Sequence, residues 1–179
     1  INITNIRESL IRPVFSKEIN NKYNELIDCF KPDVVHLNNI HTQLSPLIAE
    51  ISYNNDIPVV WTLHDFKILC PAHYCMRNGE ICELCFTNKV NVIKYRCVKN
   101  IVGSIIAFIE ALKWNLDNIN KFTSYFITPS DFMKRKMIQG GLLPSKIKML
   151  NNFLDNSKIT KDTNIKENYY LYVGRMSEE

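Results

Sequence analysis

The amino-acid sequence predicts an α/β fold in which a Rossmann-like parallel sheet carries helices on both faces. Three observations support this class. Short apolar segments typical of buried strands alternate with segments whose apolar residues recur at helical spacing. Helical segments separate successive strand-like segments, which is the pattern of βαβ units and a parallel sheet. Polar side chains follow two of the strand-like segments directly, at the edge where parallel sheets bind ligands.

The first part of the chain contains two such units. Residues 16–30 have apolar side chains at helical spacing, and Pro13 argues against one long helix from the N-terminus. Residues 34–37 are predicted to form a short buried strand. Residues 44–53 are expected to form a helix, and residues 57–63 the next strand.

The second part continues the alternation. The apolar pattern predicts one long helix over residues 101–119, with five apolar residues along one face, namely Ile105, Ile109, Leu112, Leu116 and Ile119. Residues 124–128 are predicted to be a strand. Ser130 can cap the following helix, and Gly140-Gly141 can end it. Residues 146–150 and 169–173 are predicted to be two further strands, joined by a polar linker over residues 155–167.

Composition excludes several classes of protein. Of the 179 residues, 46% are hydrophobic and 22% charged, as in an ordinary globular domain. The net charge of +4 is small and spread along the chain, so we predict no nucleic-acid partner. The longest apolar stretch, residues 101–112, is too short and too polar for a membrane span. The basic run Lys134-Arg135-Lys136 fits either a solvated helix face or contact with an anionic membrane.

Cysteines concentrate in residues 66–99, an insert with little periodicity that holds five of the six. Cys82 and Cys85 form a C-x-x-C pair, at which spacing two thiolates can share one tetrahedral zinc ion. Cys70 and Cys97 could complete a four-thiolate structural site, and the place of Cys75 is open. Free thiols and disulfides are the alternatives.

His64 and Asp65 follow the strand predicted over residues 57–63. A histidine and a carboxylate on a strand-end loop can orient a substrate hydroxyl or stabilise charge. The alternative is structural, with a histidine bonded to a backbone carbonyl and an aspartate capping a turn. Further polar residues follow the earlier strand, namely Asn38, Asn39 and His41.

Gly174 and Arg175 follow the last predicted strand. A glycine turn and a guanidinium at a strand end can bind a phosphate. The chain contains neither a P-loop nor the glycine pattern of dinucleotide-binding proteins.

In their order along the chain, these segments resemble family-four glycosyltransferases. Residues 32–41, PDVVHLNNIH, resemble the family's "PDVVHxHN" passage, although Asn38 stands where a histidine is common. Four later segments resemble the cysteine-bearing loop of one branch of the family, namely residues 62–66 (TLHDF), Cys70-Pro71, residues 78–85 and residues 95–97. Later segments resemble the strand–helix step, the domain crossover and the "GRLxxEKG" opening of a second domain, over residues 127–132, 148–155 and 172–179.

The resemblance implies a GT-B fold, with two Rossmann-like domains and the active site between them. Residues 1–154 would be a partial acceptor-side N-terminal domain, with residues 66–99 as its cysteine-rich insert. Residues 155–179 would be the linker and the first strand of a donor-binding C-terminal domain. We expect the chain to be a fragment that is inactive alone, since it lacks the family's glycine-rich loop and paired glutamates.

The implied activity is a retaining transfer, of hexosyltransferase type, from a nucleotide-sugar donor to a cell-surface glycan or lipid-linked acceptor. It requires no cofactor or catalytic metal. His64 would face the donor sugar with Asp65 beside it, and Gly174 and Arg175 would hold the donor diphosphate. The acceptor side would be lined by Asn38, Asn39 and His41. The implied location is the cytoplasm, with peripheral contact at the inner face of the membrane.

Two other functions fit parts of the sequence. One is another GT-B enzyme, such as a nucleotide-sugar epimerase, which the cysteine loop fits poorly. The other is a zinc-stabilised binding module without enzymatic activity. A module that binds nucleic acid would need a denser basic patch with interleaved aromatic residues.

Overall fold

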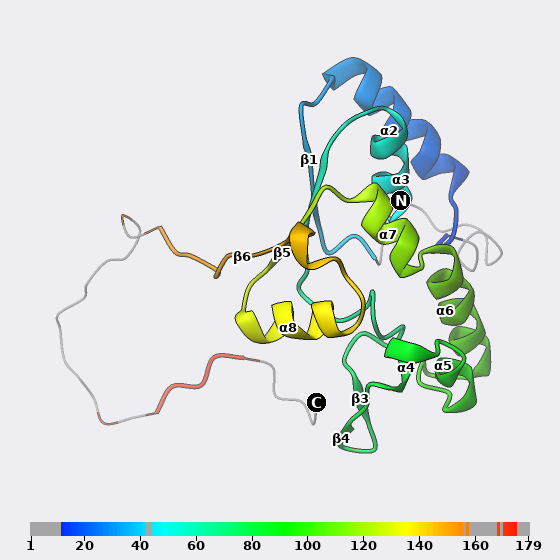
Figure 1. Ribbon diagram of the computed structural model, residues 1–179, viewed down its shortest axis with the longest axis vertical. Coiled ribbons are helices and arrows are strands. Elements are labelled where there is room, and N and C mark those ends of the chain that lie inside the picture. Colours follow the sequence, from blue (N-terminus) through cyan, green and yellow to red (C-terminus); the bar gives the residue numbers. More distant parts are fainter. Residues whose placement is uncertain (1–11, 42–43, 156, 158–167, 169, 175–179) are drawn as a thin grey trace.

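The computed structural model describes residues 12–41, 44–155, 157, 168 and 170–174. Four strands form a sheet in the order β1-β2-β5-β6 (Figure 1). All three pairings are parallel, so the carboxyl ends of the strands lie at one edge. The predicted α/β class with a Rossmann-like parallel sheet is confirmed. The strands are β1 Val35–Asn38, β2 Val59–Thr62, β5 Tyr125–Thr128 and β6 Ile147–Met149.

The two faces of the sheet differ in burial. Successive side chains of a strand point to opposite faces, and the strand register aligns residues of one face across the sheet. On the open face, Val60 is half-buried between His36 and Tyr125, which are both exposed. The buried face presents a row of paired apolar side chains, one from each strand, namely Leu37, Trp61, Phe126 and Ile147.

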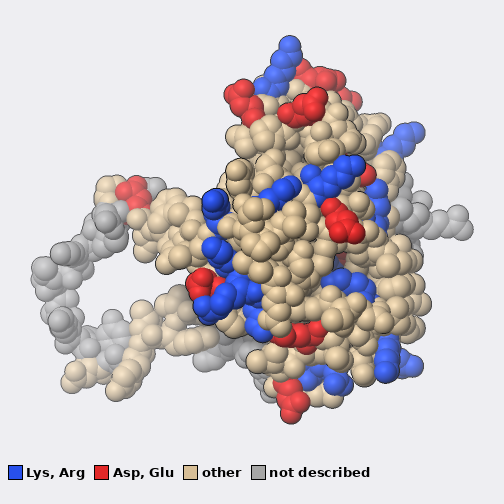
Figure 2. All heavy atoms as spheres, viewed as in Figure 1, with Lys and Arg blue, Asp and Glu red and all other residues tan. Residues whose placement is uncertain are grey.

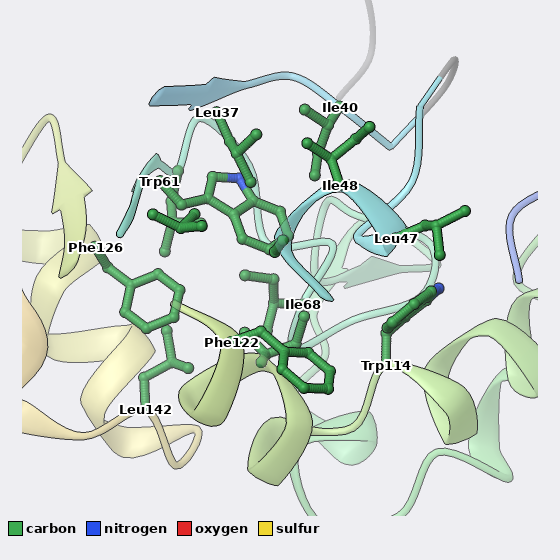
Figure 3. Close-up of a cluster of buried hydrophobic side chains, with 14 of the residues drawn as sticks. Leu37, Ile40, Leu47, Ile48, Trp61, Ile68, Trp114, Phe122, Phe126 and Leu142 are labelled. Carbon is green, nitrogen blue, oxygen red and sulfur yellow. The ribbon is translucent and has the colours of Figure 1, made fainter. Parts of the chain in front are cut away.

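Four helices contribute to the core on that buried face (Figure 3). No side chain of the described strands is buried on the open face, so the helices that we expected on both faces cover one. Each strand lies beside the next one along the chain, and right-handed crossovers in one direction place the connecting helices on one side. The four helices are α2 Lys17–Phe30, α3 Leu47–Asn54, α7 Leu116–Phe122 and α8 Asp131–Gln139.

Capping side chains mark the helix ends, and the caps that the sequence predicts for α8 are confirmed. The hydroxyl of Ser16 accepts a hydrogen bond from the Ile19 N–H at 3.3 Å and begins α2. Ser130 does the same for α8 through the Met133 N–H at 3.2 Å. Helix α8 ends at Gly140, and the next residue, Gly141, has a φ of 110°, which favours glycine.

The single helix expected over residues 101–119 is wrong. The structure has α6 Ile101–Lys113 and then α7, because Asn115 accepts a hydrogen bond from the Asn118 N–H and caps a new helix. The Trp114 indole N–H donates to the Pro13 carbonyl at 2.8 Å, which holds the junction. The residues expected to share one face are separated, because Ile105, Ile109 and Leu112 are exposed on α6 whereas Ile119 is buried on α7.

The insert over residues 66–99 contains more regular structure than its sequence indicates. A short hairpin joins β3 Met76–Arg77 to β4 Glu80–Ile81, with Asn78 and Gly79 both at positive φ in the turn. Two one-turn helices follow, α4 Leu84–Thr87 and α5 Asn91–Lys94. A 3-10 turn over Pro144–Lys146 precedes β6.

Most of the predicted linker over residues 155–167 and part of the predicted strand over residues 169–173 lie outside the described residues. Within the described part, residues 170–173 form no strand, and their side chains are exposed. A strand requires a partner for its backbone hydrogen bonds, and none pairs with this segment among the described strands. No described helix has the length and apolar character needed to cross a bilayer.

Candidate functional site

Side chains from β1 and β2 form a hydrogen-bonded chain at the carboxyl edge of the sheet. The Asn38 amide oxygen Oδ1 lies 3.1 Å from Nε2 of His64. The amide nitrogen Nδ2 of Asn38 lies 3.4 Å from Nε2 of His36. The Thr62 hydroxyl lies 2.8 Å from that same His36 nitrogen. Asn38 and Thr62 are paired in the strand register, so the chain follows directly from the parallel pairing of β1 and β2.

The hydrogen-bonding roles in this chain follow from the orientation of the Asn38 amide, which is assigned from its donors and acceptors. With the Asn38 NH2 group directed at His36, Nε2 of His36 is an acceptor, whose one lone pair takes the 2.8 Å bond from the Thr62 hydroxyl while the Asn38 amide at 3.4 Å is a weaker second donor. Asn38 then offers its oxygen to His64, which donates from Nε2. The result is a histidine held by a neighbouring strand at the exposed edge where parallel sheets bind ligands.

Asp65 is part of a local turn. Its Oδ1 accepts a hydrogen bond from the Lys67 backbone N–H at 2.9 Å. This is the turn-capping role that the sequence left open as the structural alternative. The second carboxylate oxygen of Asp65 takes no part in that bond. A contact between this oxygen and a substrate stays a prediction.

The structure places His41 away from the polar chain, in the wall of a small cavity. Its ring lies 5.4 Å from the Trp61 ring, centroid to centroid, and the cavity of about 20 Å³ is also lined by Lys67 and Glu110. Burial lowers the pKa of His41 to about 4, so the ring is neutral at neutral pH. Its Nδ1 atom is buried and has no hydrogen-bond partner among the described residues. This position makes His41 a less direct candidate for acceptor binding than Asn38.

A buried ion pair closes the same cavity. Nζ of Lys67 lies 2.9 Å from Oε2 of Glu110 and also donates to the Pro71 carbonyl. Burial raises the pKa of Glu110, and the Lys67 ammonium opposes that rise. The pair therefore ties the start of the insert to α6.

The remaining predicted site residues lie in two places. Asn39 is exposed in the loop after β1 and has a φ of 47°, a left-handed conformation that asparagine tolerates. Gly174 lies in an exposed segment, and Arg175 lies outside the described residues. Their proposed contact with a diphosphate stays a prediction.

The insert brings most of its cysteines together. Cys70 and Cys75 share a small buried cluster, and Cys85 belongs to a second one. Cys97 packs against both clusters, and the thiols of Cys75 and Cys85 are the main partners of the Cys70 sulfur. Cys82 is less buried, and its backbone N–H donates to the Cys75 carbonyl at 2.8 Å.

The grouping gives Cys75, whose place the sequence left open, a position beside Cys70 in one cluster. All six cysteines are free thiols in the structure. Among the described residues, no three His, Cys, Asp or Glu side chains are arranged so as to hold a metal ion. A structural zinc site at Cys70, Cys82, Cys85 and Cys97 therefore stays a prediction.

A comparison with protein families decides the class of this site. The model of Glycosyltransferase Family 4 matches residues 8–158. The chain belongs to glycosyltransferase family 4. The matched region contains the whole parallel sheet, the polar chain and the cysteine-rich insert. Searches of the curated proteins and of the solved structures gave no significant match.

Membership in family 4 supports a glycosyltransferase, with a sugar donor and an acceptor as its substrates. It argues against the two alternatives, a nucleotide-sugar epimerase and a non-enzymatic binding module. For this family-4 domain, the edge that carries His64 and Asn38 is the natural candidate for the part of the site that the domain supplies.

The predicted site did not include two members of the polar chain, His36 and Thr62. His36 and Asn38 are two residues apart on one strand, so the period of two could have placed them on one face. The contribution of Thr62 depends on the register between β1 and β2, which no local pattern reveals. The Lys67–Glu110 pair joins residues 43 positions apart in the printed sequence and left no local signal either.

Proposed function

We propose that this family-4 domain is the acceptor-side half of a retaining GT-B enzyme. The enzyme would move a hexose from a nucleotide-sugar donor to a glycan or lipid-linked acceptor in the cytoplasm. The observation that carries the proposal is the chain from His64 through Asn38 to His36 and Thr62, at the ligand-binding edge of a parallel sheet. Family membership supports glycosyl transfer in general.

The geometry supports an orienting role for His64. Its Nε2–H is donated to Asn38, which fixes the plane of the ring and leaves Nδ1 for another partner. Such a ring can hold a sugar hydroxyl in place, and a positioned hydrogen bond lowers the barrier by favouring the reactive geometry. A protein nucleophile is not needed, because the proposed mechanism lets the leaving diphosphate help deprotonate the acceptor. Gly174 and Arg175 are proposed to hold that diphosphate.

The proposal is tested by His64→Ala in the full-length enzyme that carries this domain. Turnover of labelled nucleotide sugars is expected to fall about 10- to 100-fold, the effect of losing one well-placed hydrogen bond. His73→Ala is the matched control, since His73 is also an exposed histidine of the same domain but lies in the insert. Near-normal turnover of folded His64→Ala would remove His64 from the site.

The basic run on α8 gives little support to membrane contact. Arg135 is paired with Asp131 one turn earlier, and Lys136 with Glu83 of the insert. Figure 2 shows basic and acidic side chains interspersed on this face of the molecule. The run is therefore better described as a solvated, ion-paired helix face, and any membrane-binding surface has to be sought elsewhere.

A further inference from the structure

The exposed residues of α6 form an apolar face, and the partly exposed Lys113 at the end of the helix is paired with Glu50. Each exposed side chain of this helix is aliphatic, and the most exposed, Val102 and Leu112, both show 53% of their surface. A surface helix of a globular protein normally shows the reverse pattern, with polar residues outward. We call these residues the α6 stripe: Ile101, Val102, Ile105, Ile109 and Leu112.

Polar contacts on the opposite side hold α6 in this orientation. The Ser104 hydroxyl accepts a hydrogen bond from the Val98 N–H at 3.2 Å, and Glu110 is paired with Lys67. Between them, Ala107 is buried in the cluster of Cys85. Turning the stripe inward would break the Glu110 ion pair and leave a charge unpaired, which costs several kcal/mol. The stripe is therefore exposed because Ser104, Ala107 and Glu110 occupy the inward face of α6.

The chain around α6 is strongly basic. Residues 84–116 contain five lysines and arginines and one acidic residue, Glu110, which is buried. Three exposed cations directly precede the helix, namely Lys94, Arg96 and Lys99. The one-turn helix α5 that carries the first of them packs against α6 (Figure 1). An exposed apolar helix face with cations at one end is the pattern of helices that lie in a membrane interface.

We propose that the α6 stripe docks this domain on an anionic lipid surface. The aliphatic side chains would enter the boundary between headgroups and acyl chains, and Lys94, Arg96 and Lys99 would meet anionic headgroups. Charge favours this occupant over a second copy of the chain, because a second α6 stripe is aliphatic and offers no anionic group to Lys94, Arg96 and Lys99. The inference rests on the proposed function in one respect, because a lipid-linked acceptor would be reached at such a surface.

The test measures co-sedimentation of the full chain with vesicles. The protein is expected to bind vesicles of phosphatidylcholine and phosphatidylglycerol at a 7:3 ratio, and to bind pure phosphatidylcholine at least tenfold more weakly. The double variant Ile105→Gln/Ile109→Gln should weaken binding to the anionic vesicles at least tenfold, because it removes two aliphatic anchors. The matched control is Leu26→Gln/Phe132→Gln, which replaces two apolar residues on α2 and α8 that are more exposed than Ile105 and Ile109, and its binding should equal that of the unmodified protein.

A second variant tests the cations. Lys94→Gln/Arg96→Gln/Lys99→Gln is expected to abolish the preference for anionic vesicles and most of the dependence on salt, since exposed charges are screened. Circular dichroism would establish that each variant is folded. Equal vesicle binding by the α6 variant and the unmodified protein would overturn the proposal. So would a dimer in sedimentation velocity that Ile105→Gln/Ile109→Gln dissociates, in the absence of vesicle binding.

The outcome is separable from the proposed function. Transfer to a water-soluble acceptor analogue by the full-length enzyme should be unchanged in the α6 variants, because the stripe lies outside the polar chain. Loss of vesicle binding with normal transfer would support the docking role. Loss of transfer in His64→Ala with normal vesicle binding tests the proposed function alone.

Discussion

Asn38 at the end of β1 holds His64 beyond the end of β2 through a hydrogen bond of 3.1 Å between Oδ1 and Nε2. The two residues are 26 positions apart, and the parallel pairing of β1 and β2 brings them together. The same asparagine contacts His36 through its other amide atom, so it connects two histidines. Asn38 is therefore a positioning residue, and four predictions start from such contacts.

Asn38→Ala should lower turnover by acting through His64. We expect a loss of about tenfold, the effect of roughly 1.4 kcal/mol, because an unheld ring samples unproductive orientations. The loss should be smaller in His64→Ala/Asn38→Ala than the product of the single losses, with a coupling energy of about 1 kcal/mol. The measurement is a double-mutant cycle on kcat/KM. Independent, multiplicative losses would contradict the positioning role.

Replacing His41 should reduce the acid sensitivity of folding. Its pKa is about 4 in the folded protein against 6.5 ordinarily, so the unfolded chain binds the proton more readily. Stability should therefore be complete above about pH 6.5 and fall as the pH drops toward 4, by up to about 3 kcal/mol.

The measurement compares urea unfolding of the unmodified chain with His41→Gln between pH 7 and pH 4. The variant should lose less stability over this interval. His64→Gln, at an exposed position, is the control and should follow the unmodified chain. Parallel curves for all three proteins would show that His41 is not buried as a neutral ring.

Replacing only Lys67 of the Lys67–Glu110 pair should destabilise the fold more than replacing both residues. Lys67→Met leaves the Glu110 carboxylate in a buried place without its partner, and we expect a loss of about 3 kcal/mol. Lys67→Met/Glu110→Leu should recover most of that loss. Urea unfolding measures both, and Lys22→Met, which breaks an exposed pair with Glu18, should have no measurable effect. A double variant as unstable as Lys67→Met would contradict this account.

The cysteine cluster makes a prediction about metal content. A structural zinc ion would appear as about one zinc per chain in protein purified without chelators. Cys85→Ser should then lose the metal and Cys29→Ser should keep it, since Cys29 is exposed on α2, outside the insert. Comparing Cys75→Ser with Cys82→Ser would identify the fourth ligand. Zinc far below one per chain, with all thiols reactive, would reject the site.

Local sequence patterns were sufficient for the order and type of most elements. Four of the five predicted strands and the predicted caps of α8 are present, because strand patterning and capping depend on residues within a few positions of one another. The strand predicted over residues 169–173 is absent from its described part. A strand forms only when a second segment pairs with it, and the pattern of one segment does not reveal such a partner. The break between α6 and α7 was missed, because the cap at Asn115 interrupts an apolar pattern that continues through it.

The sequence by itself determined the fold class and brought His64, Asn38 and the cysteines to notice. Only the tertiary structure decided which of them meet. Strand register joins Asn38 to His64 and Thr62, and packing puts Cys75 beside Cys70. The tertiary structure also decided which face of α6 is buried. The ion pair between Glu110 and Lys67 turns that side of the helix inward and leaves its aliphatic side exposed. Such contacts depend on distance in space, and periodicity along the chain does not contain that information.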